Sequence, residues 1–264
     1  MTLKPSSLFR VAVATLAMLV SVAQADKLDD ILETKTLKVG VSLFEPWTMR
    51  NEAGDLSGFE IDVANQIAED MGVEAEFVVY EWDEIISGLE SGDIDVIAGG
   101  MAITPSRALL VDFSIPYADS GITLVANIEK TKDLNSLEEA NQPSVVIAVV
   151  AGSAAEELVQ NVFDNATILS FKDSQMGGKA VHDGEAHAFI ASTPQPEFLA
   201  LQYPEILDLP LSTPMRSYRA GLAVRKGEQP LLNFLNAWIT ARDADHWLEA
   251  THDYWFDSLD WRGE

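Results

Sequence analysis

The chain has 264 residues, no cysteine, and 42 acidic against 17 basic residues, which gives a formal net charge of −25. This charge argues against nucleic acid as a partner, because phosphate binding needs clustered cations. The lack of cysteine excludes disulfides, iron–sulfur clusters and thiolate zinc sites. A hydrophobic content of 47% is ordinary for a folded globular protein, and the length suggests one large domain or two smaller ones.

The first 25 residues have the pattern of a cleaved secretory signal. Lys4 and Arg10 precede an apolar run at 11–22, and residues 23–25 (Ala-Gln-Ala) are the small residues that a signal peptidase reads. The run is shorter than the about 20 residues of a membrane-spanning helix, which argues against the alternative of an uncleaved anchor. No cysteine follows it, so a lipoprotein is excluded. We therefore expect an exported, periplasmic protein beginning at Asp26.

Apolar periodicity predicts alternating strands and helices in the first half of the exported chain. A short amphipathic segment at 29–34 comes first, and Pro46 interrupts the chain in a loop. Thr104 and Pro105 have the residue types that begin a helix as N-cap and first helical residue. In chain order we expect strands at 37–41, 76–80 and 94–98, a turn at 51–55, and helices after 58, at 82–89 and after 104.

The second half repeats this alternation. Residues 145–150 are all apolar, as in a parallel strand covered on both faces. Ser153 and Glu156 have the S-x-x-E spacing of a capping box. The order predicts an α/β protein with two lobes, each a mostly parallel sheet flanked by helices. We expect strands at 145–150, 167–171, 188–191 and 221–224, and helices at 154–163, 177–183 and 230–242, before a tryptophan-rich segment at 247–261.

Motifs for catalysis, metal binding or cofactor binding are absent from the sequence. It contains no phosphate-binding or dinucleotide-binding glycine pattern, no H-E-x-x-H and no G-x-S-x-G. Asp93 and Asp95 have the spacing of a carboxylate pair, but we expect them to solvate the start of a strand. We therefore expect no catalytic residue, no metal and no cofactor. Surface or structural roles are predicted for all four histidines, which are His182, His187, His246 and His252.

One segment has the composition of an anion-binding site. Residues 94–107 read I-D-V-I-A-G-G-M-A-I-T-P-S-R, a predicted buried strand that ends in two glycines and leads into a capped helix. Arg107, in the first turn of that helix, opposes the helix dipole and is a poor choice for helix stability. A guanidinium binds a carboxylate through two parallel hydrogen bonds, and open α/β folds bind ligands at the carboxyl ends of strands. Arg107 is therefore either a clamp for a small carboxylate or the partner of a structural acid, and the segment alone does not decide between them.

The chain resembles a known family along its exported length. Residues 58–63, G-F-E-I-D-V, resemble the G-[FIL]-[DE]-x-[DE] signature of the family 3 bacterial solute-binding proteins, the periplasmic receptors of polar amino acid ABC importers. The segments 112–117 (D-F-S-I-P-Y), 221–227 (G-L-A-V-R-K-G) and 255–256 (W-F) are similar to later segments of that family, in the same order.

The resemblance implies a two-lobed clamshell of type II that closes on a small ligand. The first lobe would comprise 26–118 and 220–264 and the second lobe 122–217, with hinge crossings near 117–121 and 218–221. It also implies a receptor without enzymatic activity, which captures a small carboxylate-bearing amino acid or amino-acid-like ligand and delivers it to a membrane ABC permease. We expect a monomer that binds no nucleic acid.

Positions of the ligand site follow from the resemblance. Arg107 falls where the family arginine binds the ligand α-carboxylate, and Ala102 stands where Ser or Thr is common. Trp47 is interpreted as core packing beneath the cleft. The implied ligand-binding residues are Phe44, Trp82, Gly99, Gly100, Ala102, Arg107, Val150, Ser153, Ala154 and Ser192, with Ser42, Glu45 and Tyr117 as further candidates.

Ser192 departs from the family pattern. Amino-acid receptors of this family usually have Asp or Glu there to pair with the ligand ammonium, and an ammonium without a partner in a closed cleft is costly. Glu45 could supply the missing charge, or the aromatic candidates could hold a cation by their faces. The ligand could also lack a free amine, as in an N-acylated amino acid, an ectoine-like compound, an organic acid or a sulfonate. We favour two of these explanations together, the aromatic faces and a ligand without a free amine.

Two other functions on the same fold stay open. Periplasmic cyclohexadienyl dehydratases resemble this family, and Glu45, Asp173 and Glu185 are the acids available to such an enzyme. A ligand-binding module of a sensor or chemoreceptor has no sequence feature that separates it from a transport receptor.

Overall fold

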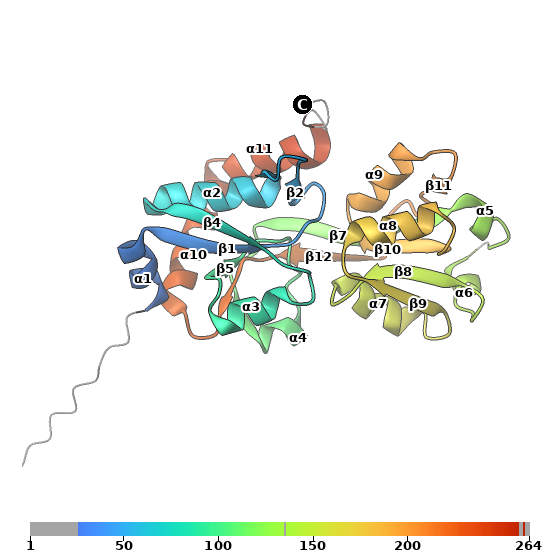
Figure 1. Ribbon diagram of the computed structural model, residues 1–264, viewed down its shortest axis with the longest axis horizontal. Coiled ribbons are helices and arrows are strands. Elements are labelled where there is room, and N and C mark those ends of the chain that lie inside the picture. Colours follow the sequence, from blue (N-terminus) through green and yellow to red (C-terminus); the bar gives the residue numbers. More distant parts are fainter. Residues whose placement is uncertain (1–25, 135, 259–260, 262–264) are drawn as a thin grey trace, which may run out of the picture.

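A computed structural model describes residues 26–134, 136–258 and 261, and the predicted signal segment at 1–25 lies outside them. The described chain forms two lobes side by side along the long axis of the molecule (Figure 1), and each lobe is built around its own sheet. None of the helices in these residues has the length and apolar character needed to cross a bilayer.

The first lobe contains a five-stranded sheet with the strand order β4-β1-β5-β13-β6. Strand β1 pairs in parallel with β4 and β5, whereas β13 is antiparallel to both β5 and β6. The α2 and α11 helices lie above this sheet in Figure 1, and α3 and α4 lie below it. The strands are β1 (Thr36–Val41), β4 (Glu74–Val79), β5 (Val96–Ile97), β6 (Val111–Phe113) and β13 (Ala223–Arg225), and a hairpin of β2 (Met49–Arg50) and β3 (Leu56–Ser57) stands apart. The helices are α1 (Lys27–Thr34), α2 (Phe59–Met71), α3 (Ile85–Ser91), α4 (Pro105–Ala108), α10 (Gln229–Ala244), α11 (Trp247–Asp253) and the π-helical turn η1 (Tyr254–Ser258).

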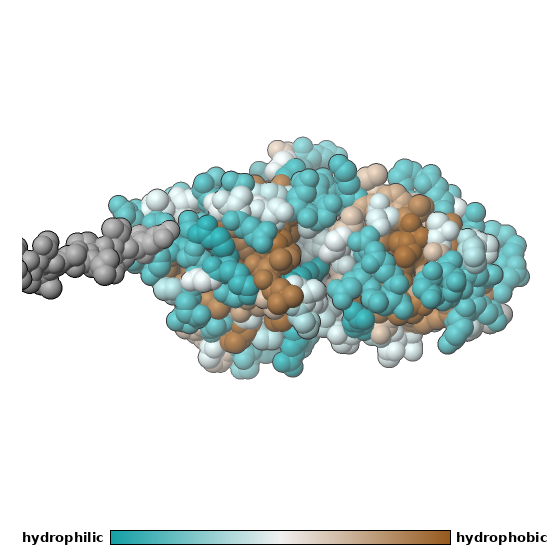
Figure 2. All heavy atoms as spheres, turned by 90° about the horizontal axis from the view of Figure 1, so that it is seen from below, coloured by the Kyte–Doolittle hydropathy of each residue, from teal (hydrophilic) through white to brown (hydrophobic). Residues whose placement is uncertain are grey.

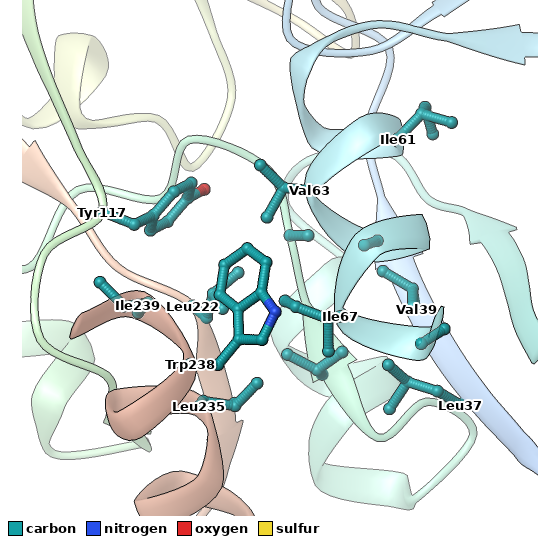
Figure 3. Packing of buried hydrophobic residues seen from close by; sticks show 14 of the residues in the cluster. Leu37, Val39, Ile61, Val63, Ile67, Tyr117, Leu222, Leu235, Trp238 and Ile239 are labelled. Carbon is teal, nitrogen blue, oxygen red and sulfur yellow. The ribbon is translucent and has the colours of Figure 1, made fainter. Parts of the chain in front are cut away.

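The core of the first lobe joins α2 and α10 to the sheet. Trp238 of α10 packs between Ile67 of α2 and Leu222 (Figure 3), and all three are buried in one cluster. The Trp238 indole N–H donates to Asp70 at 2.7 Å, so the ring is buried with its polar atom satisfied. Burying a large apolar side chain contributes roughly 1.5–3 kcal/mol, and this cluster therefore holds the two helices against β1.

The second lobe contains a six-stranded sheet with the order β11-β7-β10-β8-β9, and β12 pairs with β7 as well. Strands β8, β9 and β10 are parallel, and β7 runs antiparallel to β10, β11 and β12. Helix α7 covers one face through Leu158 and Val159, and α8 and α9 cover the other face (Figure 1). The strands are β7 (Ala118–Asn127), β8 (Val146–Val150), β9 (Thr167–Phe171), β10 (Ala188–Ser192), β11 (Leu207–Asp208) and β12 (Arg216–Ala220); the helices are α5 (Ile128–Thr131), α6 (Leu137–Ala140), α7 (Ala154–Val162), α8 (Ser174–His182) and α9 (Gln195–Gln202).

Two antiparallel strands carry the chain between the lobes. Strand β7 begins at Ala118, five residues after the end of the first-lobe strand β6, and β12 ends at Ala220 just before β13 returns to the first lobe. The two strands pair from Ala118 opposite Ala220 to Ile122 opposite Arg216. The predicted hinge crossings therefore fall on one two-stranded ribbon, while the hinge motion itself stays a prediction.

The architecture confirms the predicted two-lobed α/β clamshell. The predicted strand at 221–224 is present as β13, but its antiparallel direction was not predicted, because apolar periodicity does not encode strand direction. Strand β7 was not predicted as a strand. Helix α3 begins at Ile85 rather than at Trp82, which leaves the Trp82 side chain on the wall between the lobes. Hydrophilic residues cover much of the face seen in Figure 2, on both lobes.

Candidate ligand-binding site

A cavity lies between the two lobes and is lined by residues of both. It encloses about 610 Å³ of space, including its open mouth. The first lobe contributes Ser42, Phe44, Trp82, Ala102, Arg107 and the glycine pair at 99–100. The second lobe contributes Val150, Ser153, Ala154 and Ser192. All ten implied ligand-binding residues, and Ser42 in addition, therefore line the same cavity.

The loop at 99–100 approaches the core closely. Gly100 has a φ of +60°, and a Cβ there would lie 2.9 Å from the Trp47 ring. A glycine is therefore needed both for the backbone conformation and for the packing. Trp47 is 1% exposed and contacts the Phe59 and Phe256 rings, which agrees with the predicted core role. It also lines the cavity.

Arg107 is held in the cavity wall by backbone carbonyls. The Thr104 hydroxyl accepts a 3.3 Å hydrogen bond from the Arg107 backbone N–H and caps α4, as predicted. The guanidinium donates from Nη1 to the Ala102 carbonyl at 3.2 Å and from Nη2 to the Gly152 carbonyl of the second lobe at 3.0 Å. It also lies over the Trp82 ring, 5.6 Å from the ring centre.

The guanidinium of Arg107 has no ion-pair partner among the residues that the structure describes. Among residues 26–134, 136–258 and 261, no carboxylate forms an ion pair with Arg107. Arg107 is 9% exposed, and burial lowers the pKa of its guanidinium. Glu157 attracts the guanidinium from a distance without forming an ion pair with it. A buried cation without an ion-pair partner is costly, and such a position favours a bound anion.

The second-lobe wall is the N-terminus of α7. The Ser153 hydroxyl accepts from the Glu156 N–H at 3.1 Å, and the Glu156 carboxylate accepts from the Gly152 N–H at 2.8 Å. The capping box is therefore present, with its return bond one residue earlier than predicted. Ala154 and Ala155 line the cavity at the first two helical positions, where backbone N–H groups have no intrahelical acceptor. Such N–H groups and the helix dipole suit an anion.

Ser192 is engaged by another hydroxyl rather than by a charge. Tyr218, on the crossing strand β12, donates from its hydroxyl to the Ser192 Oγ at 2.8 Å, and both residues line the cavity. Burial raises the pKa of the Tyr218 hydroxyl, which therefore stays neutral at physiological pH. This corner of the cavity offers hydroxyl groups to a ligand but no carboxylate.

Lys172 and Asp173 were missed as ligand-binding candidates. Both line the cavity, and within the described part of the chain Asp173 is the one carboxylate that does so. Its Oδ1 accepts from the Met176 N–H at 2.8 Å and caps α8, which begins at Ser174 rather than at the predicted residue 177. The D-S-Q-M sequence has the N-cap spacing that could have located this helix start.

Two of the further candidates stand away from the cavity lining. Glu45 is not among the lining residues. The Tyr117 hydroxyl donates instead to the buried Glu60 carboxylate, at 2.5 Å. Neither side chain therefore contributes directly to the cavity wall.

One group of side chains has geometry compatible with a metal ion. His252, Asp253 and Asp257 have ligand atoms within 4.8 Å of one another, and none of them lines the cavity. The two aspartates are exposed. Asp95 was expected to solvate the start of a strand, but it is buried, accepts from the Lys38 N–H at 2.9 Å and pairs with Lys27 at 3.3 Å.

Comparison with known families decides the classification. Residues 37–258 match the model of the bacterial extracellular solute-binding proteins, family 3. The chain belongs to this family. The resemblance read from the residues at 58–63 and the later segments is thereby confirmed.

Proteins with different names are similar to this chain over most of its length. Cyclohexadienyl dehydratase from Pseudomonas aeruginosa is 25% identical over 251 residues, 93% of each chain. The L-cystine-binding protein TcyJ from Escherichia coli K12 is 26% identical over 240 residues, covering 89% of this chain and 88% of that protein. The crystal structure of the ancestral amino acid-binding protein AncCDT-1, a precursor of cyclohexadienyl dehydratase, matches with a TM-score of 0.80 and 32% identity over 88% of this chain and all of that chain.

Proposed function

We propose that this family 3 protein is the periplasmic solute-binding receptor of an ABC importer. It captures a small carboxylate-bearing amino acid, or an amino-acid-like compound, between its lobes and delivers it to a membrane permease. Relatives that are named as amino-acid-binding proteins support this class of ligand.

The observation that carries the proposal is the unpaired guanidinium of Arg107 in the cavity wall. A guanidinium has five N–H donors, and the bonds to the Ala102 and Gly152 carbonyls use two of them. The remaining guanidinium donors form one group that favours a negative charge, and the N-terminus of α7 across the cavity forms the other. A ligand carboxylate supplies that charge and offsets the cost of burying the cation.

The opposite pole of the ligand is less strongly defined. Ser192 and Tyr218 offer hydroxyl groups, whereas Asp173 offers the carboxylate that an ammonium would need. The absence of an acid at position 192 therefore does not leave the cavity without a negative group. A free amine bound at Asp173 becomes the simplest arrangement, and N-acylated and amine-free carboxylates remain the alternatives to test; the named relatives give no support to an ectoine-like ligand.

A ligand panel tests the proposal. Thermal unfolding is recorded with the L-amino acids, their N-acetyl derivatives, their decarboxylated amines and simple organic acids. A bound compound raises the unfolding midpoint through mass action. We expect at least one carboxylate to raise it, and its decarboxylated counterpart to have no effect. A panel in which decarboxylated amines bind as tightly as the parent acids would exclude the Arg107 carboxylate site.

An enzyme on the same fold is the second candidate, because one relative at 93% coverage is a dehydratase and Asp173 places an acid in the cavity. Prephenate and arogenate are the substrates with which such an activity is tested. Turnover is followed by formation of the aromatic product, with Asp173→Asn as the matched variant. If the unmodified protein turns the substrate over and Asp173→Asn does not, the result favours the enzyme. Reversible binding without turnover favours the receptor.

A further inference from the structure

Glu60 is a fully buried carboxylate next to the cavity, with 0% of its surface exposed. Its place follows from the first turn of α2. The Phe59 N–H donates to the Pro46 carbonyl at 3.1 Å and the Glu60 N–H donates to the Trp47 carbonyl at 2.9 Å, so the helix start is fastened to the loop before it. A Cβ at Gly58 would lie 2.5 Å from the Trp47 carbonyl oxygen, which explains the glycine that opens the family signature. This attachment turns Glu60 inward.

Both strong contacts of Glu60 converge on one of its oxygens. The Oε1 atom accepts from the Gly100 backbone N–H at 2.6 Å and from the Tyr117 hydroxyl at 2.5 Å. The Oε2 atom is buried and has no hydrogen-bond partner among the described residues. Two donors on a single oxygen are the arrangement that stabilises a carboxylate charge.

The two donors belong to parts of the molecule with different roles in the cleft. Gly100 lines the cavity, on the loop that follows β5. Tyr117 precedes the crossing strand β7, and its backbone N–H donates to the Ala220 carbonyl of β12 at 3.0 Å. One carboxylate therefore joins the cavity loop, the ribbon between the lobes and the first-lobe core.

We propose that Glu60 is a positioning residue for the cleft: its carboxylate holds the Gly100 amide of the cavity wall against the Tyr117 hydroxyl at the start of the crossing ribbon. The contacts themselves do not depend on any ligand. Only the consequence for ligand binding rests on the function proposed above.

The charge on Glu60 sets how strongly this link is held. Burial raises the pKa of Glu60 to about 7, although the bonds from Tyr117 and Gly100 act in the opposite direction. The titratable groups that interact with it are the hydroxyls of Tyr117 and Tyr218, and burial raises the pKa of both, so neither changes charge near neutral pH. Arg107 lowers the pKa of Tyr218, and the His252 ring makes an edge contact with the Phe59 ring at 5.8 Å. The ionised carboxylate accepts stronger hydrogen bonds than the neutral acid, so the loop is held more tightly above pH 7 than below it.

The chemical shift of the Gly100 amide tests this directly, without a ligand. The sequence contains two Gly-Gly pairs, at 99–100 and 177–178. Labelling with carbonyl-¹³C, ¹⁵N-glycine and recording only amides that follow a labelled carbonyl therefore isolates Gly100 and Gly178. Gly178 lies within α8 and serves as an internal control. We expect the Gly100 proton resonance to move downfield between pH 5.5 and 8.5 with a midpoint around 7, and the Gly178 resonance to stay constant.

Two variants decide the assignment. Glu60→Gln keeps the side-chain shape and one acceptor oxygen but cannot ionise, so the Gly100 titration disappears. Tyr117→Phe leaves the carboxylate but removes a bond that favours its charged form, so the midpoint rises above that of the unmodified protein. A Gly100 titration that persists in Glu60→Gln, or a midpoint unaffected by Tyr117→Phe, would overturn the proposal. These measurements use no ligand, so their outcome is independent of the ligand panel. The proposal for Glu60 and the proposed receptor function can therefore fail independently.

Discussion

The Arg107 guanidinium of the first lobe donates a 3.0 Å hydrogen bond to the Gly152 carbonyl of the second lobe. The proposed ligand clamp is thus also a contact between the lobes. The two lobes also approach each other at two neighbouring places. A Cβ at Gly152 would lie 3.2 Å from the Asp83 Cα, and the Trp47 indole N–H donates to the Thr193 carbonyl at 3.5 Å. Under the proposed function, the guanidinium that binds the ligand carboxylate is therefore the same group that joins the two lobes.

Loss of the Arg107 side chain should weaken binding of any carboxylate ligand found in the panel. Removing one partner of a buried, hydrogen-bonded charge pair costs about 2–5 kcal/mol, which is roughly 30-fold or more in affinity. We expect Arg107→Ala to lose at least this factor by titration calorimetry. Arg107→Lys should recover little of it, because an ammonium cannot make the two parallel bonds of a guanidinium.

Arg50→Ala is the matched control for this change, since Arg50 is an exposed arginine of the same lobe. It removes the same charge from the protein without touching the cavity. Equal affinities for Arg107→Ala and Arg50→Ala would contradict the role of Arg107 as a clamp.

Asp173→Asn should separate ligands with a free amine from those without one. Asparagine caps helices about as well as aspartate, so α8 should keep its stability. We expect at least a ten-fold loss of affinity for a ligand with a free ammonium and little change for its N-acetyl derivative. Calorimetry with each such pair measures the difference, and an equal loss for both compounds would show that Asp173 acts only as a helix cap.

Glu60→Gln should change how stability depends on pH. The ordinary pKa of a glutamate carboxyl is 4.5, and burial raises the pKa of Glu60 to about 7 in the folded protein. Between these values the folded protein holds a proton that the unfolded chain has released, so stability falls as the pH rises through this window. The full difference is about 3 kcal/mol above pH 7.

Urea unfolding of the two proteins at pH 5 and pH 8 measures this effect. Glutamine cannot ionise, so Glu60→Gln should gain stability relative to the unmodified protein as the pH rises. A difference between the two proteins that is the same at both pH values would mean that Glu60 does not titrate in this window.

Gly100→Ala should destabilise the first lobe more than Gly72→Ala does. The two glycines have similar positive φ values, +60° and +69°, but a Cβ at Gly100 meets the Trp47 ring, whereas one at Gly72 has no atom within 4 Å. Backbone strain of about 1–3 kcal/mol is common to both variants. The excess loss in the Gly100 variant, read from urea midpoints, reports the clash with Trp47, and equal losses would show that the ring moves aside freely.

The helix starts with a recognised capping residue were predicted well, whereas the starts of α3 and α8 were each misplaced by three residues. Thr104 and Ser153 were identified as caps, and each accepts a bond from the residue three positions later. Such bonds depend on residue types at a short spacing, so they are visible in the chain itself. Asp173 obeys the same rule and was recognisable on the same grounds.

Contacts between distant segments were beyond this kind of prediction. The pairing of β7 with β12 joins residues that are about a hundred positions apart, and the bond from Gly100 to Glu60 spans forty. The acid at position 60 could be matched to a family signature, but its complete burial and its link to Tyr117 could not be derived from spacing.

The order of residues was thus sufficient for the α/β class and the family, because caps, apolar periodicity and short motifs are properties of neighbouring positions. Through the family resemblance it also gave ten residues that line the cleft, but it missed Lys172 and Asp173 as ligand-binding candidates. Only the folded arrangement decided that no carboxylate of the described residues forms an ion pair with Arg107, that Asp173 lines the cavity, and that Glu60 joins the cavity loop to the crossing strands. Each of these depends on which segments the fold brings together and on what it removes from water, and burial, not sequence spacing, sets the energy of a charge.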